Sequence, residues 1–574
     1  MTLTPWGNDA VLELDGEPVV DVIDRGLVFT RGKSYPLSLL NENLLLKDST
    51  LTLNSNGDPT TLGLSFDPDL GMARTMEAKE MPWSISSSPG NHTSGLFTFK
   101  VACSKLKKDW DVTAHLISES MADEVARVEV NDLLISELGA IFFREDTRPL
   151  TVTFEPGMRG LWVALEEVGE PALGMKYSPA LKTLVQVPES LKLSWQVTGG
   201  ESTGIFWLQI VCPDVSEPFG IKGRVVSRIA AEEIEALRLG WVTLDLKKPE
   251  PKFIRDTTNQ LILQIKPESA LIGMKVALVA VDGDPDLGMS YVPDLGESNA
   301  RVIPADGKLL WGVRPGKVKS GLFGLHLRFI EIDAVLPLVC RLLSKNVSDE
   351  VTRLEVDGKV VTAPLVVFLH GKTHQISVTF QPWMQGLNTY LGSDGKFIVS
   401  NPPLMESVEI PDDLTVNWQV NNTGVSTFNG VTVSVRGDRA PIVEMASMGI
   451  SSRHLSENLL DEIQYFFLNK KSINLSLMDL GFDNSGKNVI ELQFKGATNT
   501  YGALQGIGVV LEAVDDGLGS DLVFEPPLGE VRYFSNNHYV QWRVLGVSQS
   551  SSFNLKLRFI YFDAEYILHC RQLS

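Results

Sequence analysis

Short runs in which hydrophobic and polar residues alternate with a period of two follow one another along the whole chain. One run, Leu193 to Val197 (LSWQV), places Trp195 and the apolar residues two positions away on one face of an extended chain, because side chains alternate sides along a β-strand. Comparable runs surround four more tryptophans, which are Trp83, Trp311, Trp418 and Trp542. The pattern predicts a half-buried strand with a buried Trp, repeated five times.

The five tryptophans are separated by 107 to 124 residues, and other markers recur in the same order around them. A Leu-Gly pair precedes the Trp, at Leu70, Leu173, Leu287, Leu391 and Leu518. A closing strand follows the Trp and ends on Ser118, Ser227, Ser344, Ser447 and Ser574. Several markers in a constant order indicate a tandem array of one structural unit.

Each repeat contains a series of short runs of Val, Leu, Ile, Phe and Trp separated by Gly, Pro, Asp and Asn. About seven short strands in roughly 110 residues are typical of an immunoglobulin-like sandwich. We therefore predict an all-β protein of five tandem immunoglobulin-like β-sandwich domains in an extended array, with short helical segments at the junctions. The predicted domains are residues 1–118, 119–227, 228–344, 345–447 and 448–574.

The fourth junction is expected to differ from the others. In the first three junctions a Glu follows the closing Ser after six residues, whereas Glu462 follows Ser447 after 15 residues. In this segment and directly after it, Leu455, Leu459, Leu460 and Ile463 have helical spacing, which favours an amphipathic helix. We therefore expect a helical linker within 448–574 and a fifth domain on a longer hinge.

Composition narrows the classes of partner. The 574 residues include 51 basic and 71 acidic side chains, for a net charge of −20. This balance argues against nucleic acid or an anionic membrane surface as the main partner, because both require clustered Lys and Arg. The sequence contains no apolar segment of the roughly 20 residues that a membrane span needs. Residues 1–9 lack the pattern of a secretory signal, so we expect a cytoplasmic protein or one exported without a cleaved N-terminal signal.

The cysteines indicate a structural role. There are four of them, with no more than one in any predicted repeat: Cys103, Cys212, Cys340 and Cys570. No repeat can therefore close an internal disulfide. We expect these residues to be buried, reduced side chains of strands.

An acidic turn in the third repeat is a candidate calcium site. Asp282, Asp284 and Asp286 occupy alternate positions, and such carboxylates can converge on a calcium ion, which takes 6 to 8 oxygen ligands. The alternative is an ordinary turn, because Asp and Pro set turn geometry by themselves. Calcium is the only cofactor that the sequence suggests.

The fourth repeat contains the tripeptide Arg436-Gly437-Asp438 in the predicted loop between its last two strands. This location resembles that of the integrin-binding RGD in fibronectin type III modules. The resemblance implies a protein-binding loop, whereas a chance occurrence in a turn of suitable composition is the alternative.

Two further motifs have simpler explanations than the chemistry they suggest. His370 and His374 could share a metal ion on a helix, but a turn between two strand runs is the better interpretation. The G-x-S-x-G match at 200–204 lies between two predicted strands, whereas a hydrolase nucleophile needs a strand followed by a helix. We therefore expect no enzymatic activity from either motif.

At the level of architecture the chain resembles tandem bacterial immunoglobulin-like arrays, such as those of adhesins and surface appendages. The resemblance implies a non-enzymatic rod for binding, adhesion or structural assembly. Its expected partner is a protein or a glycan, and the rod could form an oligomer or part of a larger assembly. Two alternatives remain open. One is a toxin or secreted effector that docks on a host cell through Arg436, Gly437 and Asp438, and the other is an enzyme with its site at a domain junction.

Overall fold

The computed structural model describes most of the chain. The described residues are 6, 10–18, 26–56, 59–88, 93–169, 173–281, 285–361, 365–393, 398–423, 427–436, 445–483, 486–495, 506–514, 521–534, 539–546, 552–560 and 564–573. No helix among them is long and apolar enough to cross a membrane.

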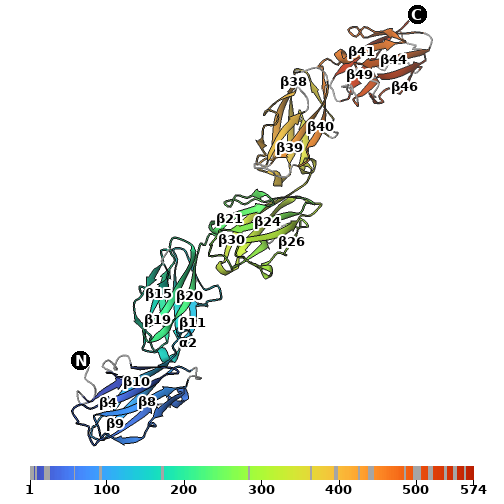
Figure 1. Cartoon of the computed structure of the whole chain (residues 1–574). Helices are drawn as coiled ribbons and strands as arrows, with labels where there is room; N and C mark the ends of the chain where they lie inside the picture. The colour runs from blue at the N-terminus through green and yellow to red at the C-terminus, as the bar shows by residue number, and fades with distance from the viewer. Residues whose placement is uncertain are drawn as a thin grey trace.

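Ten five-stranded sheets pack in pairs as five β-sandwich domains, which follow one another in an extended row (Figure 1). Each pair of sheets encloses its own cluster of buried hydrophobic side chains. The prediction of an all-β array of five tandem immunoglobulin-like domains is therefore confirmed.

The second domain shows the strand arrangement that the others repeat. One sheet has the order β12-β11-β14-β18-β16 and the other has the order β13-β20-β19-β15-β17. All pairs are antiparallel except β13 with β20. The strands are β11 (Val125–Val130), β12 (Leu133–Leu134), β13 (Ala140–Phe143), β14 (Thr147–Phe154), β15 (Trp162–Val168), β16 (Lys176–Ser178), β17 (Val185–Gln186), β18 (Lys192–Thr198), β19 (Gly204–Cys212) and β20 (Val215–Val226).

The other four domains contain the same ten-strand set. They run from β1 (Val11–Leu14) to β10 (Trp110–Ile117), from β21 (Ile234–Leu239) to β30 (Ala334–Leu343), from β31 (Val351–Val356) to β40 (Met448–Leu455) and from β41 (Ile463–Leu468) to β50 (Glu565–Gln572). The expectation of about seven strands per domain was too low, because strands of two to four residues, such as β12 and β17, are too short to produce a visible alternation.

The recurrent Trp fills the centre of each sandwich. Trp195 lies on β18 directly opposite Leu150 of β14, and its side chain is 1% exposed. The other four tryptophans of the repeat are buried as well. Alternate positions of the same strand face solvent, as the burial pattern of β18 shows. The period-two pattern thus marks the core, as predicted.

The leucine of the Leu-Gly marker packs against a strand glycine. This contact shows that the sequence analysis chose the wrong leucine in two repeats. A side-chain carbon at Gly204 would lie 2.9 Å from Leu173, and one at Gly95 would lie 2.9 Å from Leu62. The first-domain equivalent of Leu173 is therefore Leu62, not Leu70. In the fourth domain Leu391 lies within strand β35 (Asn388–Ser393), so it is not the marker either. The leucine recurs because a glycine at the start of a later strand, such as Gly204 of β19, leaves room for its side chain.

A buried carboxylate closes the linker between consecutive domains. At the first junction the backbone N–H of Ser118 donates to Glu124 Oε1 at 2.6 Å, and the Ser118 hydroxyl donates to Asp123 Oδ2 at 2.7 Å. The linker glutamates end one short helical turn at each junction, which are α2 (Met121–Glu124), α3 (Ala230–Glu233), η6 (Val347–Glu350) and η8 (Leu459–Glu462). The predicted helical segments at the junctions are confirmed.

A cationic side chain on the last strand of one domain reaches into the next domain. Arg341 of β30 donates from Nη1 to the carbonyl oxygens of Trp383 and Gln385, at 2.5 and 2.7 Å. Arg224 of β20 makes the same pair of bonds to Ala270 and Ile272, both at 2.6 Å. The strand register places His115 on β10 and Arg453 on β40 at the corresponding positions. Consecutive domains are thus joined by directional hydrogen bonds as well as by packing.

The fourth junction follows the same plan, so the prediction of a longer helical hinge was wrong. Residues 448–455 form β40, which pairs within the second sheet of the fourth domain. The closing Ser is Ser456, whose N–H donates to Glu462 Oε1 at 3.0 Å after the usual six residues. The fourth domain therefore extends past the predicted limit of 447. Polar residues of β40, such as Ser452 and Arg453, hid the strand from sequence analysis.

Replacing Trp195 with Ala should lower the free energy of unfolding of the second domain by about 3–5 kcal/mol, because a large buried side chain is lost. Trp241 offers a matched control, since it lies in a hairpin turn after β21 and is 95% exposed. Calorimetry of the intact chain should show one shifted transition for Trp195→Ala and none for Trp241→Ala. Equal effects of the two substitutions would contradict the core role of Trp195.

Replacing Arg341 with Ala should loosen the third junction, because hydrogen bonds to a charged group contribute about 1.5–3 kcal/mol each. Small-angle scattering should show a wider distribution of interdomain distances for this variant. Arg328→Ala is the control, because Arg328 lies on the neighbouring strand β29 (Gly321–Phe329) and pairs with Glu297 and Asp333 of its own domain. If both variants scatter like the unmodified protein, the arginine does not stiffen the junction.

Candidate binding groove of the fifth domain

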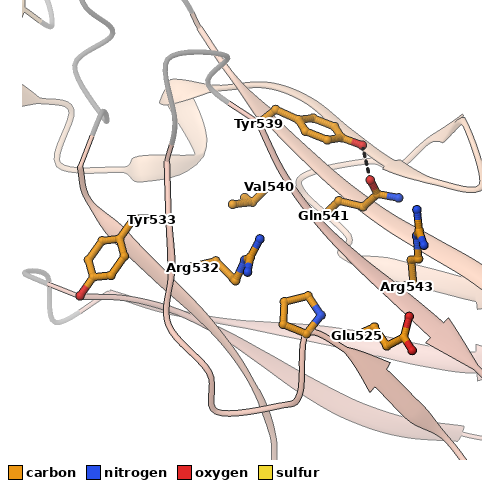
Figure 2. A pocket seen from close by; sticks show the side chains of 8 residues that line it. Glu525, Arg532, Tyr533, Tyr539, Val540, Gln541 and Arg543 are labelled. Carbon is orange, nitrogen blue, oxygen red and sulfur yellow. Dashed lines mark hydrogen bonds between the residues drawn. The ribbon is translucent and has the colours of Figure 1, made fainter.

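The fifth domain carries an open polar groove of about 350 Å³. It lies where the edge strands of the two sheets, β46 (Val523–Glu525) and β47 (Arg532–Tyr533), approach β48 (Tyr539–Leu545), as Figure 2 shows. The lining residues are Glu525, Pro526, Arg532, Tyr533, Tyr539, Val540, Gln541 and Arg543. Sequence analysis missed this groove, because its residues come from three strands with no common motif.

Two tyrosines provide the aromatic surface of the groove. Tyr533 is 60% exposed and Tyr539 is 36% exposed. The Tyr539 hydroxyl donates to Glu491 Oε1 at 2.6 Å and lies 3.1 Å from Gln541 Oε1. Burial and the Glu491 carboxylate raise the pKa of Tyr539 to about 12. The hydrogen bonds of the hydroxyl restrict the orientation of the ring.

Two arginines provide the charge. Arg543 of β48 lies directly opposite Glu525 of β46 in the strand register, and Figure 2 shows both side chains on the same side of the groove. Arg532 Nη1 lies 3.6 Å from Glu530 Oε1. Guanidinium groups donate several hydrogen bonds in a fixed geometry, and Tyr and Arg are the residue types that dominate binding hot spots. The groove can hold a polar ligand by stacking and hydrogen bonds.

The candidate calcium site is described only in part. Asp286 Oδ1 accepts a hydrogen bond from the backbone N–H of Gly288 at 2.9 Å, which is the behaviour of an aspartate that shapes a turn. Asp282 and Asp284 lie outside the described residues. Across the part of the chain that the structure describes, no three His, Cys, Asp or Glu side chains are grouped to hold a metal. Calcium binding stays a prediction.

The tripeptide at 436–438 lies mostly outside the described residues. Arg436 is the last residue of β39 (Thr427–Arg436), and Gly437 and Asp438 fall in the segment that is not described. Where the chain is described again, Ala446 pairs with Asn346 of the third linker. Ala446 therefore lies beside a domain junction, and the role of the tripeptide in binding stays a prediction.

His370 and His374 are not on a helix, and a third histidine joins them. His374 lies on β34 (Thr373–Phe380), where its Nδ1 is 2.6 Å from Asp357 Oδ2 and its Nε2 accepts from the N–H of Leu369 at 2.8 Å. His454 of β40 is fully buried. The His374 and His454 rings both lie 5.3 Å from the ring of Phe368. Sequence spacing could not reveal this cluster, because the strand pairing brings His454 in from 80 residues away.

The four cysteines lie in the hydrophobic cores of the sandwiches, and the G-x-S-x-G match lies in a turn. Cys103, Cys212, Cys340 and Cys570 are buried and form no disulfide, as expected, and burial raises the pKa of Cys570 to about 12. Residues 200–203 form the turn between β18 and β19. The G-x-S-x-G match therefore lacks the helix that a hydrolase nucleophile requires.

Comparison with known proteins gives only a general likeness. No family model and no curated protein matches the sequence. Similar solved structures include a D1–D4 ectodomain fragment of ICAM-5, with 9% identity over 78% of this chain and 99% of that chain and a TM-score of 0.22. They also include the Yersinia pseudotuberculosis adhesin InvE, with 12% identity over 42% of this chain and 68% of that chain and a TM-score of 0.22. The D00-D0 domain of intimin has 9% identity over 38% of this chain and 100% of that chain, with a TM-score of 0.19.

The buried histidine predicts that the fourth domain is sensitive to acid. Burial, followed by the charges of His370 and His374, lowers the pKa of His454 to about 4. The unfolded chain takes up this proton near pH 6.5 and the folded chain does not, so stability falls as the pH drops from about 6.5 to 4. The full loss is on the order of 3 kcal/mol.

His454→Val tests this prediction, because Val225 occupies the same place in the second domain. The domain-four transition, followed by urea unfolding of the intact chain at pH 7 and pH 4.5, should depend less on pH in this variant. The other titratable groups around the cluster, including Asp357 and the Lys372–Glu457 pair, are retained in it. An unchanged pH dependence would show that His454 is not the cause.

Proposed function

We propose that this protein is a non-enzymatic rod for binding, adhesion or structural assembly, and that the groove of the fifth domain is a ligand-contacting surface. The partner is a protein or a glycan. The groove supports this proposal because it combines exposed tyrosine rings with arginine side chains on β47 and β48.

The rod architecture supports the same proposal. Each domain is a closed sandwich, and six-residue linkers with buried glutamates join one to the next. Short linkers and directional hydrogen bonds limit the relative motion of neighbouring domains, so a surface on the fifth domain is held away from the first (Figure 1). Spacing of this kind is useful for a protein that must reach a partner.

Binding of the intact chain to arrays of glycans and cell-surface proteins tests the proposal. Any ligand recognised by the groove should bind at least about tenfold more weakly to the double variant Arg532→Ala, Tyr533→Ala, because truncated hot-spot residues commonly cost more than 1 kcal/mol. Tyr465→Ala is the matched control, since Tyr465 is an exposed tyrosine on β41, where it stacks on Phe467 of the same strand. Binding that is unaffected by the double variant, or reduced equally by the control, would contradict a role for the groove.

A further inference from the structure

The second junction is built differently from its neighbours. In the first and third junctions the linker glutamate accepts a hydrogen bond from a serine of the preceding domain, Ser94 to Glu124 at 2.5 Å and Ser320 to Glu350 at 2.6 Å. At the second junction Thr203 stands in the place of these serines. Glu233 Oε2 accepts from the hydroxyl of Ser269, in the following domain, at 2.6 Å, and Glu350 Oε2 likewise accepts from Trp383 Nε1 of its following domain at 2.5 Å. The second junction therefore differs in having a threonine in place of the serine of the preceding domain.

A cavity of about 520 Å³ lies at this junction. Leu173, Ile205 and Pro267 form its apolar wall, and the polar wall includes Glu233, Lys266 and Glu268. Cavities at domain interfaces that combine an apolar lining with a few polar groups are common ligand sites.

An exposed apolar patch continues from the cavity onto the outer sheet face of the second domain. Ile205 belongs to both and is 42% exposed. Trp207 follows it on the same face of β19 and is 49% exposed, and Val168 lies directly opposite Trp207 on β15 and is 50% exposed. The residues at the position of Trp207 in the other domains are small or polar: Thr98, Gly324, Asn429 and Asn554. The packing of the sandwich therefore does not require a Trp at this place.

The charge of the cavity favours a cation. Glu233 and Glu268 contribute two carboxylates, and Lys266 contributes one ammonium group, whose Nζ already donates to the carbonyl oxygen of Glu232 at 2.5 Å. One negative charge remains in excess. A basic side chain of a ligand would neutralise the excess negative charge of the cavity. An apolar side chain of the same ligand would cover the exposed ring of Trp207, and Trp is one of the residue types enriched at binding hot spots.

We propose that the junction of the second and third domains is a docking site for an extended peptide segment of a partner protein. A lysine or arginine of that segment enters the cavity, and an apolar side chain two positions away packs on Trp207. The spacing of two residues follows from the site itself. Ile205 and Trp207 are two residues apart on one strand, and an extended peptide has about the same rise per residue.

A fluorescent blocked peptide with the sequence Ser-Arg-Ser-Leu-Ser serves as the probe, and polarisation measures its binding to the intact chain. We expect saturable binding that weakens by about tenfold in Trp207→Thr and in Glu268→Gln. Both side chains are at the surface, so folding should be preserved, and circular dichroism can verify it. Trp162→Thr is the matched control, since Trp162 is exposed at the far end of β15; this variant should bind like the unmodified protein.

Two further probes complete the test. Replacing Arg by Glu in the peptide should abolish binding, and replacing Leu by Ser should weaken it as much as Trp207→Thr does. The proposal is overturned if the Arg peptide does not bind, if the Glu peptide binds equally well, or if Trp207→Thr has no effect. Neutral oligosaccharides that bind at Trp207 while the Arg peptide does not would instead indicate a glycan site. These results do not depend on Arg532 or Tyr533, so they are independent of the fifth-domain groove.

Discussion

The rod depends on a carboxylate that is buried at each domain junction. A buried charge is costly unless hydrogen bonds satisfy it, and the junction supplies them from the closing strand itself, as with the N–H of Ser118 to Glu124. Burial still raises the pKa of Glu124. The N–H that donates to the carboxylate lies only six residues before it in sequence, so the linker has few accessible conformations. The hydrogen bond to the carboxylate therefore fixes the position of the following domain.

The arginine contacts add direction to this arrangement. Arg224 and Arg341 each span from a closing strand to two carbonyl oxygens of a turn in the next domain. Two acceptors fix the orientation of a planar guanidinium group better than one. Together with the buried glutamates they make each domain a support for its neighbour, so that surface features on different domains keep a defined spacing.

One edge strand of each domain is followed directly by a proline. An exposed edge strand is a template for association, and in the second domain β16 is such an edge but is only three residues long. A proline follows it directly, and the same holds for the corresponding strand in every domain, at Pro68, Pro179, Pro293, Pro402 and Pro526. Proline lacks the N–H that a further strand would need. Pairing of a further strand along this edge is therefore disfavoured.

The sequence by itself determined the repeat, the fold class and the buried tryptophans, because the alternation around Trp195 depends only on the two-residue period of a strand. It failed where the tertiary structure supplied the missing partner. Strand β40 has polar residues that become buried where it pairs with β33 (Leu365–Leu369) and β39, so the fourth domain was ended too early. The cluster around His374 and His454, the groove where β46 and β47 approach β48, and the cavity beside Glu233 were likewise invisible, because each consists of residues from separate strands or domains. Periodicity records which side of a strand is buried, but only the folded chain decides which surfaces meet.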